Sequence, residues 1–309
     1  MVAPASMLSS KAVSYPGCAL FALGLAWGAA SCSKDKDAAP EKPAQTATKA
    51  EPTKAEPTKA EPTKATGPGA PAPTPAKVAP VATRPEGPIG TIEGKVTLTG
   101  EVPEMPLLRR GSDPVCDNGE LRAETITAAK DGGLANVLVR IKPGTVPAWT
   151  PSTPVVIDQT DCMYRPRVTG GVRGQTVEVR NSDKTTHNVH ARHLPLGKRQ
   201  GIETIVNRAQ PSGVAMSFEL GDEPVAKLKC DYHGWMQGYV VVSDNPYFAV
   251  TGADGSFTLE GAPAGSQTIE FWHEYYGLKE AKAEVAADGS VTLDASFDVA
   301  SDDPMGESK

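Results

Sequence analysis

The stretch CDYHGWMQGYVVV, residues Cys230–Val242, places a group of unusual side chains directly before a strand-like run. Cys230, His233 and Met236 follow one another at intervals of three residues, although the chain of 309 residues has only 5 cysteines and 5 histidines. A thiolate, an imidazole and a thioether are donors that suit copper. The β-branched residues that follow predict a strand. We therefore expect a metal centre at the end of a β-sheet.

The residues before Cys230 predict a second strand. In VAKLKC, residues 225–230, alternate side chains lie on the same face, so Ala226, Leu228 and Cys230 share one side. If this apolar face points inward, the sulfur atom lies beside the core. A copper site with two histidines, one cysteine and a distant methionine transfers electrons in blue-copper proteins. The pattern therefore requires one more histidine.

The segment GQTVEVRNSDKTTHNVHARH, residues 174–193, supplies candidates for that histidine. Val177 and Val179 alternate as in a half-buried strand, a turn follows, and His187 comes next. His190 and His193 also raise the possibility of a second metal site. We interpret them instead as exposed histidines, because His190 is expected to point away from the face that carries His187.

The chain from Gly90 onward consists of short runs rich in β-branched and aromatic residues. Gly, Asp, Asn and Pro separate these runs, and no helical stripe of useful length competes with them. Many short, evenly spaced strands are typical of sandwiches and barrels. We therefore predict an all-β fold.

Two motifs in residues 154–243 resemble those of the cupredoxins, specifically the plastocyanin and amicyanin branch. YRPRVTGGVRGQTVEVRNSDKTTHNV, residues 164–189, matches the entry to the first ligand, and residues 230–242 match the short ligand loop. The resemblance implies a Greek-key β-sandwich that holds one type 1 (blue) copper ion. We place this domain at residues 146–245.

The resemblance also implies roles for individual residues. His187, Cys230, His233 and Met236 would be the copper ligands, and Asn188 would tie the two ligand segments together by hydrogen bonds. His233 would lie near the surface and carry electrons out, as the second histidine does in that family. Trp235 departs from the family's short loop. It is expected beside the copper, in a docking patch, or as a half-exposed aromatic residue that covers the loop.

The sequences on either side of this domain resemble a second family, the carboxypeptidase regulatory-like (transthyretin-like) β-sandwich. The matching motifs are Ile92–Val96, Asn136–Val139 and Thr251–Gly265. We therefore predict a discontinuous sandwich made of residues 89–145 and 246–300, with the cupredoxin domain inserted in it or adjacent to it, and a tail at 301–309.

The first 88 residues are not expected to fold into a core. Residues 1–31 read as a secretion signal, and GAASC, residues 28–32, resembles the lipobox of bacterial lipoproteins, in which Cys32 would be acylated. A plain cleaved signal is the alternative. Residues 32–88 are rich in Pro, Ala, Lys and Glu and repeat EPTKA three times, which indicates an extended linker. We expect an exported protein, anchored by lipid at a periplasmic or cell-surface membrane face.

Three cysteines remain once Cys18 and Cys32 are set aside. Unpaired thiols are uncommon in an oxidising compartment unless they are used. Because Cys230 has a histidine and a methionine beside it, we expect a disulfide between Cys116 and Cys162. The alternative is that Cys116 and Cys162 are both free and buried.

These features favour an electron carrier that works with redox partner proteins. A copper-delivery protein, or a metal-free tethered binding module, is the alternative, and zinc could occupy the same donors although methionine is a poor zinc ligand. We expect neither an enzyme nor a small-molecule substrate, because no catalytic motif is complete; His273 and Glu274 begin an HExxH pattern, but Gly277 replaces its second histidine. The net charge of −6 and the lack of a basic run argue against nucleic-acid binding.

Overall fold

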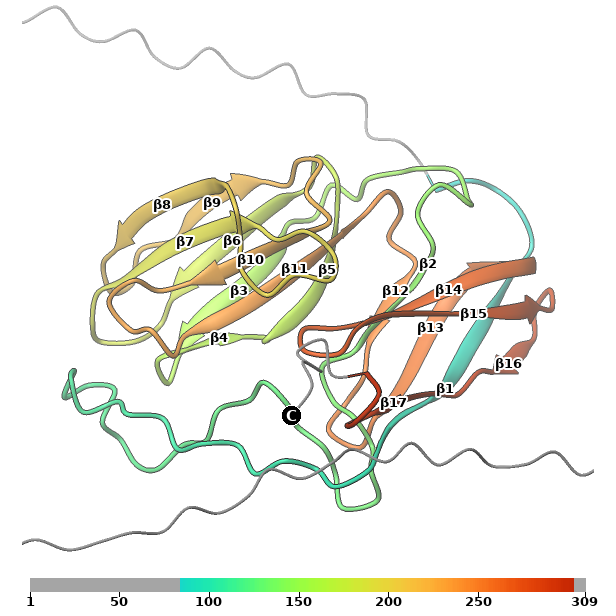
Figure 1. Cartoon of the computed structure of the whole chain (residues 1–309). Coiled ribbons are helices and arrows are strands. Elements are labelled where there is room, and N and C mark those ends of the chain that lie inside the picture. Colours follow the sequence, from blue (N-terminus) through green and yellow to red (C-terminus); the bar gives the residue numbers. More distant parts are fainter. Residues whose placement is uncertain (1–83, 303–309) are drawn as a thin grey trace, which may run out of the picture. The chain divides into compact units, whose positions relative to one another are not determined.

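A computed structural model describes residues 84–302 of the chain. Within this range every regular element is a β-strand, and there is no helix, so the expected all-β class is confirmed. The expected signal segment, the lipidated Cys32, nearly all of the linker and most of the tail lie outside the described residues. Figure 1 shows the strands gathered into two bodies, one coloured from green through yellow to light orange and the other mainly in orange and red.

The first body, here called the host sandwich, takes strands from both ends of the described chain. One sheet contains β13 (Ser256–Pro263), β1 (Ile89–Thr99), β16 (Ser290–Thr292) and β17 (Ala295–Asp298). The other contains β12 (Phe248–Val250), β2 (Leu138–Ile141), β14 (Gly265–His273) and β15 (Gly277–Val285). Both sheets contribute to one apolar core, which includes Ile92, Leu259, Ile141 and Phe271.

The second body, here called the inserted sandwich, is formed by the chain between β2 and β12. Its five-stranded sheet has the order β5 (Val168–Val172), β11 (Gln237–Ser243), β10 (Val225–Lys229), β7 (His187–His193) and β8 (Thr204–Gln210). The facing sheet has the order β4 (Met163–Arg165), β3 (Val155–Thr160), β6 (Thr176–Asn181) and β9 (Met216–Glu219). This division of strands places all the candidate ligands in the inserted sandwich.

Period-two alternation builds the core of the inserted sandwich. Val177 and Val179 point inward from β6, and Val189 and Ala191 point inward from β7, all fully buried. Burying one such aliphatic side chain stabilises a fold by about 1.5–3 kcal/mol. The side chain of His187 belongs to the same inward row as Val189 and Ala191, so the pattern that forms the core also directs the imidazole inward.

Strand β11 is buried on both faces, which explains its run of valines. Val240 and Val242 face the core of the inserted sandwich, whereas Tyr239 and Val241 belong to a third apolar cluster. That cluster also contains Leu138 and Trp272 of the host sandwich, so it joins the two bodies. A strand covered on both sides reads as a continuous apolar run instead of alternating.

Two buried ion pairs accompany this apolar junction. Arg167, next to β5, forms a two-pronged pair with Glu274 of the host sandwich, and their side chains are 5% and 2% exposed. Arg140 of β2 bonds to Glu270 and also donates to the carbonyl oxygen of Val242 at 2.6 Å. Buried charges require such partners, because an unpaired charge in an apolar junction is costly.

An irregular segment between β1 and β2 reaches the inserted sandwich. Its residues 110–119, here called the cover segment, are held by a disulfide between Cys116 and Cys162 with an S–S distance of 2.05 Å. The Arg110 side chain of the same segment donates to the carbonyl oxygen of Asp161 at 2.9 Å. The pairing of these two cysteines agrees with the sequence-based expectation and leaves Cys230 as a buried free thiol.

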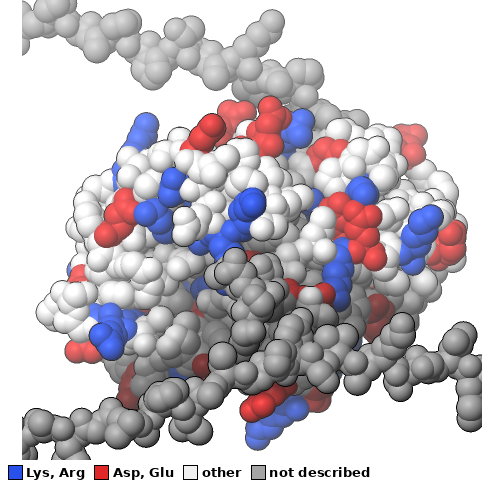
Figure 2. Space-filling model, viewed as in Figure 1, with Lys and Arg blue, Asp and Glu red and all other residues white. Residues whose placement is uncertain are grey.

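Charged side chains are mixed on the surface. On the face drawn in Figure 2, blue and red side chains alternate over the described residues instead of separating into areas of one sign. A basic field, which nucleic-acid binding requires, is not visible on that face. Between Arg84 and Asp302 the chain has no helix with the length and apolarity needed to cross a bilayer.

Candidate metal centre

His187 opens strand β7 and is completely buried. The preceding turn, residues 182–186, connects β6 in one sheet to β7 in the other, so this histidine enters the core at one end of the sandwich. Its backbone pairs with Gln210 of β8, which fixes the register of the strand end. The position of the imidazole is therefore set by sheet pairing.

Cys230, His233 and Met236 lie in the short loop between β10 and β11. The two strands pair as far as Lys229 and Gln237, so the loop is a tight connection. Two backbone bonds close it: the amide of Cys230 donates to the carbonyl of Met236 at 3.3 Å, and the amide of Met236 donates to that of His233 at 2.9 Å. These bonds direct three potential ligands toward the same end of the core.

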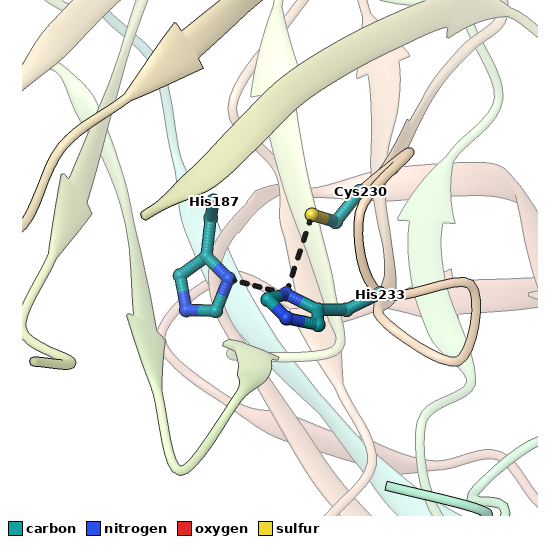
Figure 3. A group of neighbouring side chains, drawn as sticks. All are labelled: His187, Cys230 and His233. Carbon is teal, nitrogen blue, oxygen red and sulfur yellow. Dashed lines mark hydrogen bonds between the residues drawn. The ribbon is translucent and has the colours of Figure 1, made fainter. Parts of the chain in front are cut away.

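Three ligand atoms from the two segments converge. The Nδ1 atoms of His187 and His233 are 2.9 Å apart, and Cys230 Sγ lies 3.7 Å from Nδ1 of His233. Figure 3 shows both rings and the sulfur directed toward a common point. Metal–nitrogen bonds of about 2.0 Å and a metal–sulfur bond of about 2.3 Å would give angles of about 90–120° at one shared ion. The donor set fits a trigonal arrangement.

All four predicted ligands are buried. His187 and Met236 are 0% exposed, Cys230 is 1% exposed and His233 is 3% exposed. Met236 lies in the same apolar core as Cys230. His187, Cys230 and His233 form a group whose ligand atoms lie within 4.8 Å of one another. Methionine is the expected weak fourth donor of a site of this composition.

The position of His233 corrects one expectation. The sequence-based prediction that His233 lies near the surface is wrong, because the cover segment lies against it. Asp113 Oδ2 is 3.2 Å from Nε2 of His233, and Cys116 Sγ is 3.9 Å from the same nitrogen. The Trp235 ring also packs against His233, with ring centroids 5.1 Å apart, and its Nε1 donates to the carbonyl of Cys162.

Asn188 lies where the sequence places it, between the two ligand segments. Its backbone amide donates to Cys230 Sγ at 3.4 Å, and its side-chain oxygen accepts from the amide of Asp231. The side-chain amide donates to Asn207 Oδ1 at 2.6 Å. Such bonds hold ligand residues in a fixed orientation, so Asn188 links β7 to the loop that carries the sulfur.

The electrostatics of the centre favour a thiolate. Burial alone raises the pKa of Cys230, but hydrogen bonds from His187 and from three backbone amides outweigh it, and the net pKa is lowered. Burial likewise lowers the pKa of His187, yet bonds to Asp183 and Cys230 raise it to about 9. The pKa of His233 is lowered by burial and by the neighbouring His187. The thiolate is the form that binds metal.

The remaining histidines lie away from this centre. His190 bonds Asp231 at 2.8 Å and Thr204 at 3.0 Å, and it is partly buried, as is His193. Both are less exposed than expected, although His190 does point away from the row of His187. His273 is buried in the host sandwich, where its Nδ1 accepts from the amides of Tyr275 and Tyr276.

Two carboxylates at the centre were not singled out by the sequence. Asp183 Oδ2 is 2.9 Å from Nε2 of His187, and Asp113 occupies the same position on His233. Asp183 lies four residues before His187, in the turn that leads into β7, a spacing that could have identified it. No local signal identifies Asp113, because it is 120 residues from His233 and belongs to the cover segment.

Comparison with known proteins gives fold-level likenesses of limited extent. No family model matches the chain, and no curated protein matches it. Among solved structures, a copper-containing nitrite reductase (NirK) from Thermus scotoductus SA-01 is 22% identical, over 33% of this chain and 25% of that one, with a TM-score of 0.26. This chain therefore spans about a quarter of that enzyme.

Two smaller proteins are similar over most of their own length. A purple cupredoxin from Nitrosopumilus maritimus is 23% identical over 29% of this chain and 99% of its own, with a TM-score of 0.25. An oxidised amicyanin variant is 23% identical over 29% and 82%, with a TM-score of 0.26.

Proposed function

We propose that the chain is a type 1 copper protein that transfers electrons. The observation that carries this proposal is the convergence of His187 Nδ1, His233 Nδ1 and Cys230 Sγ at one buried point. Two imidazoles and a thiolate in a trigonal arrangement, with a methionine close by, are the donors of blue-copper electron-transfer sites. When bound, the ion supplies one-electron exchange between Cu(I) and Cu(II).

The composition of the site supports copper over zinc. Structural zinc sites use four cysteine, histidine or carboxylate ligands in a tetrahedron, and thioether sulfur is a poor ligand for zinc. Here the carboxylates of Asp113 and Asp183 contact the outer ring nitrogens of the histidines, on the side away from the shared point. The centre thus offers three strong donors and Met236.

The rigidity of the site supports electron transfer over delivery or catalysis. His187 belongs to a paired strand, and Cys230 and Met236 lie at the ends of a loop closed by backbone bonds. A fixed frame keeps the ligand geometry similar in both oxidation states. The ligands are at most 3% exposed, which favours a resident ion over one that is handed on, and leaves little room for a substrate.

We extend the proposal to the setting of the protein. The sequence of residues 1–88 supports export, acylation at Cys32 and a linker that holds the folded part away from a membrane. The partners would be redox proteins that exchange one electron. The strand order of the host sandwich and its motifs support a carboxypeptidase regulatory-like domain, whose role here would be structural.

The proposal is tested by the visible and EPR spectra of the full chain loaded with Cu(II) and then reduced. We expect an intense thiolate-to-copper band with narrow copper hyperfine splitting, and bleaching on reduction. Cys230→Ala should remove the band, whereas the matched control Cys162→Ala with Cys116→Ala should retain it. A colourless or tetragonal spectrum in the unaltered protein would refute the assignment.

A further inference from the structure

The two predicted histidine ligands have the same outer-shell contact, although they come from different segments. Both rings direct Nδ1 toward the shared point, which leaves each Nε2–H facing away. His187 Nε2 is 2.9 Å from Asp183 Oδ2, and His233 Nε2 is 3.2 Å from Asp113 Oδ2. A carboxylate that accepts the outer N–H of a ligand histidine fixes the ring orientation and raises the basicity of the ligand nitrogen.

Each carboxylate is itself held in place. Asp113 accepts from the hydroxyl of Thr185 at 2.7 Å and from the amide of Val115 at 2.8 Å. Asp183 accepts from the amide of Cys162 at 2.9 Å through the oxygen that contacts His187. Neither carboxylate is therefore free to rotate away from its histidine without losing further bonds.

The disulfide links the segment that carries Asp113 to the backbone that bonds to Asp183. Asp113 lies three residues before Cys116 on the cover segment, and Asp183 is bonded to the backbone of Cys162. The bond between Thr185 and Asp113 joins the cover segment to the turn that carries Asp183. One covalent link thus fixes the relative position of both carboxylates, although the two aspartates come from segments 70 positions apart in the chain.

We propose that Asp113 and Asp183 are positioning residues of the metal centre, and that the Cys116–Cys162 disulfide holds Asp113 on His233. This inference rests on the proposed function. Asp113 serves a second purpose in this arrangement, because it covers the imidazole edge that would otherwise lie open to solvent. The cover segment and the neighbouring Trp235 both contact His233.

The two carboxylates are expected to lower the reduction potential of a bound copper ion. Two carboxylates that accept from the ligand imidazoles increase donation to the ion and add negative charge nearby, which stabilises Cu(II) more than Cu(I). Loss of an outer-shell partner typically weakens metal binding by about 10–100-fold. If Asp113→Asn weakens Cu(II) binding tenfold and leaves Cu(I) binding unchanged, the one-electron potential rises by about 59 mV.

The test compares three single variants of the full chain: Asp113→Asn, Asp183→Asn, and Asp117→Asn as a control on an exposed residue of the same cover segment. The readouts are the reduction potential, Cu(II) affinity by competition with a chelator, and the EPR spectrum. We expect the first two variants to raise the potential and weaken Cu(II) binding at least tenfold, and the control to match the unaltered protein. Potentials within 15 mV of the unaltered value in both variants would overturn the proposal.

Two further measurements distinguish a wrong role for the disulfide from a wrong electron-transfer function. The pair Cys116→Ser and Cys162→Ser should shift the potential in the same direction as Asp113→Asn, and an unchanged potential would overturn the role of the disulfide. If the unaltered protein binds Cu(II) without a thiolate band, the electron-transfer function fails, yet Zn(II) affinity still reports positioning through the same histidines. Zn(II) binding that is equal in all variants, or absent in the unaltered protein, overturns the inference.

Discussion

Replacing His273 should change how the stability of the protein depends on pH. Burial, followed by the nearby charge of Arg167, lowers the pKa of His273 from 6.5 to about 3. The ring packs against Tyr276 and Phe297 in the host core, and its Nε2 has no hydrogen-bond partner among the described residues. The folded protein therefore keeps this imidazole neutral in acid.

The direction and size of the change in unfolding free energy follow from the pKa values of His273 in the unfolded and folded states. Below pH 6.5 the unfolded chain binds a proton at His273 that the folded chain does not bind until about pH 3. Unfolding is therefore favoured progressively as the pH falls between these values. At pH 4.5 the unfolded chain is two pH units below its pKa at His273 and binds the proton, whereas the folded protein hardly binds it. The unfolding free energy is therefore about 3 kcal/mol lower than at pH 7.5.

The variant His273→Asn isolates this contribution. Its side-chain oxygen can accept from the amides of Tyr275 and Tyr276 as Nδ1 does, but it does not titrate. Its smaller volume lowers stability by an amount that is independent of pH. The assay is urea unfolding at pH 7.5, 6.0 and 4.5, and the unfolding free energy of the variant should fall by about 3 kcal/mol less over this range. His193→Asn serves as the control for removing a partly exposed imidazole.

Parallel curves of unfolding free energy against pH for the variant and the unaltered protein would contradict this prediction. Parallel curves would mean that His273 takes up its proton in the folded state as readily as in the unfolded chain. A smaller but clear divergence would place the folded pKa between the two limits.

Three other predictions concern the junction, the disulfide and the centre. Replacing Cys116 and Cys162 together by serine should lower the unfolding free energy by about 4 kcal/mol for a closed loop of this length, measured by urea denaturation under oxidising conditions; no change would show that the link leaves the unfolded chain unconstrained. Glu274→Gln should destabilise the protein by about 3–5 kcal/mol, because it leaves the buried charge of Arg167 unpaired. The double variant with Arg167→Met should lose much less stability in thermal unfolding, and an equal loss would contradict this explanation. Because the pKa of His187 is raised to about 9, copper binding at pH 7 should displace a proton from this imidazole, and this contribution should diminish as the pH rises through 9. Calorimetry in buffers of different ionisation enthalpy measures the release, and none at pH 7 would contradict the protonated state of His187.

The sequence predicts the parts of this fold that depend on local pattern. Alternation in residues 176–181 and 187–193 anticipates strands β6 and β7, and the spacing from Cys230 to Met236 anticipates a tight loop between two strands. The same alternation places His187 in the inward row. These features follow from the pleat of the strand, in which successive side chains point to opposite faces of the sheet.

Local sequence patterns do not predict the contacts between segments that lie far apart in the chain. The burial of His233 depends on the cover segment, whose residues 110–119 have no regular pattern and gain their position from a disulfide and from Arg110. The valines of β11 predict a strand, but not that its second face meets Leu138 and Trp272 of the host sandwich. Asp113 becomes recognisable as a partner of His233 only when the cover segment is in place.

The insertion between β2 and β12 has a mechanical consequence. These strands are antiparallel neighbours, and Phe248 lies opposite Arg140, so the chain leaves and re-enters the host sandwich at adjacent points. Strands β1 and β17 are parallel partners, so tension applied at Ile89 and Asp298 loads their ladder in shear, all bonds together. The force then runs through the host sandwich and bypasses the inserted one. Pulling on the chain would therefore leave the inserted sandwich unloaded until the host sandwich itself unfolds.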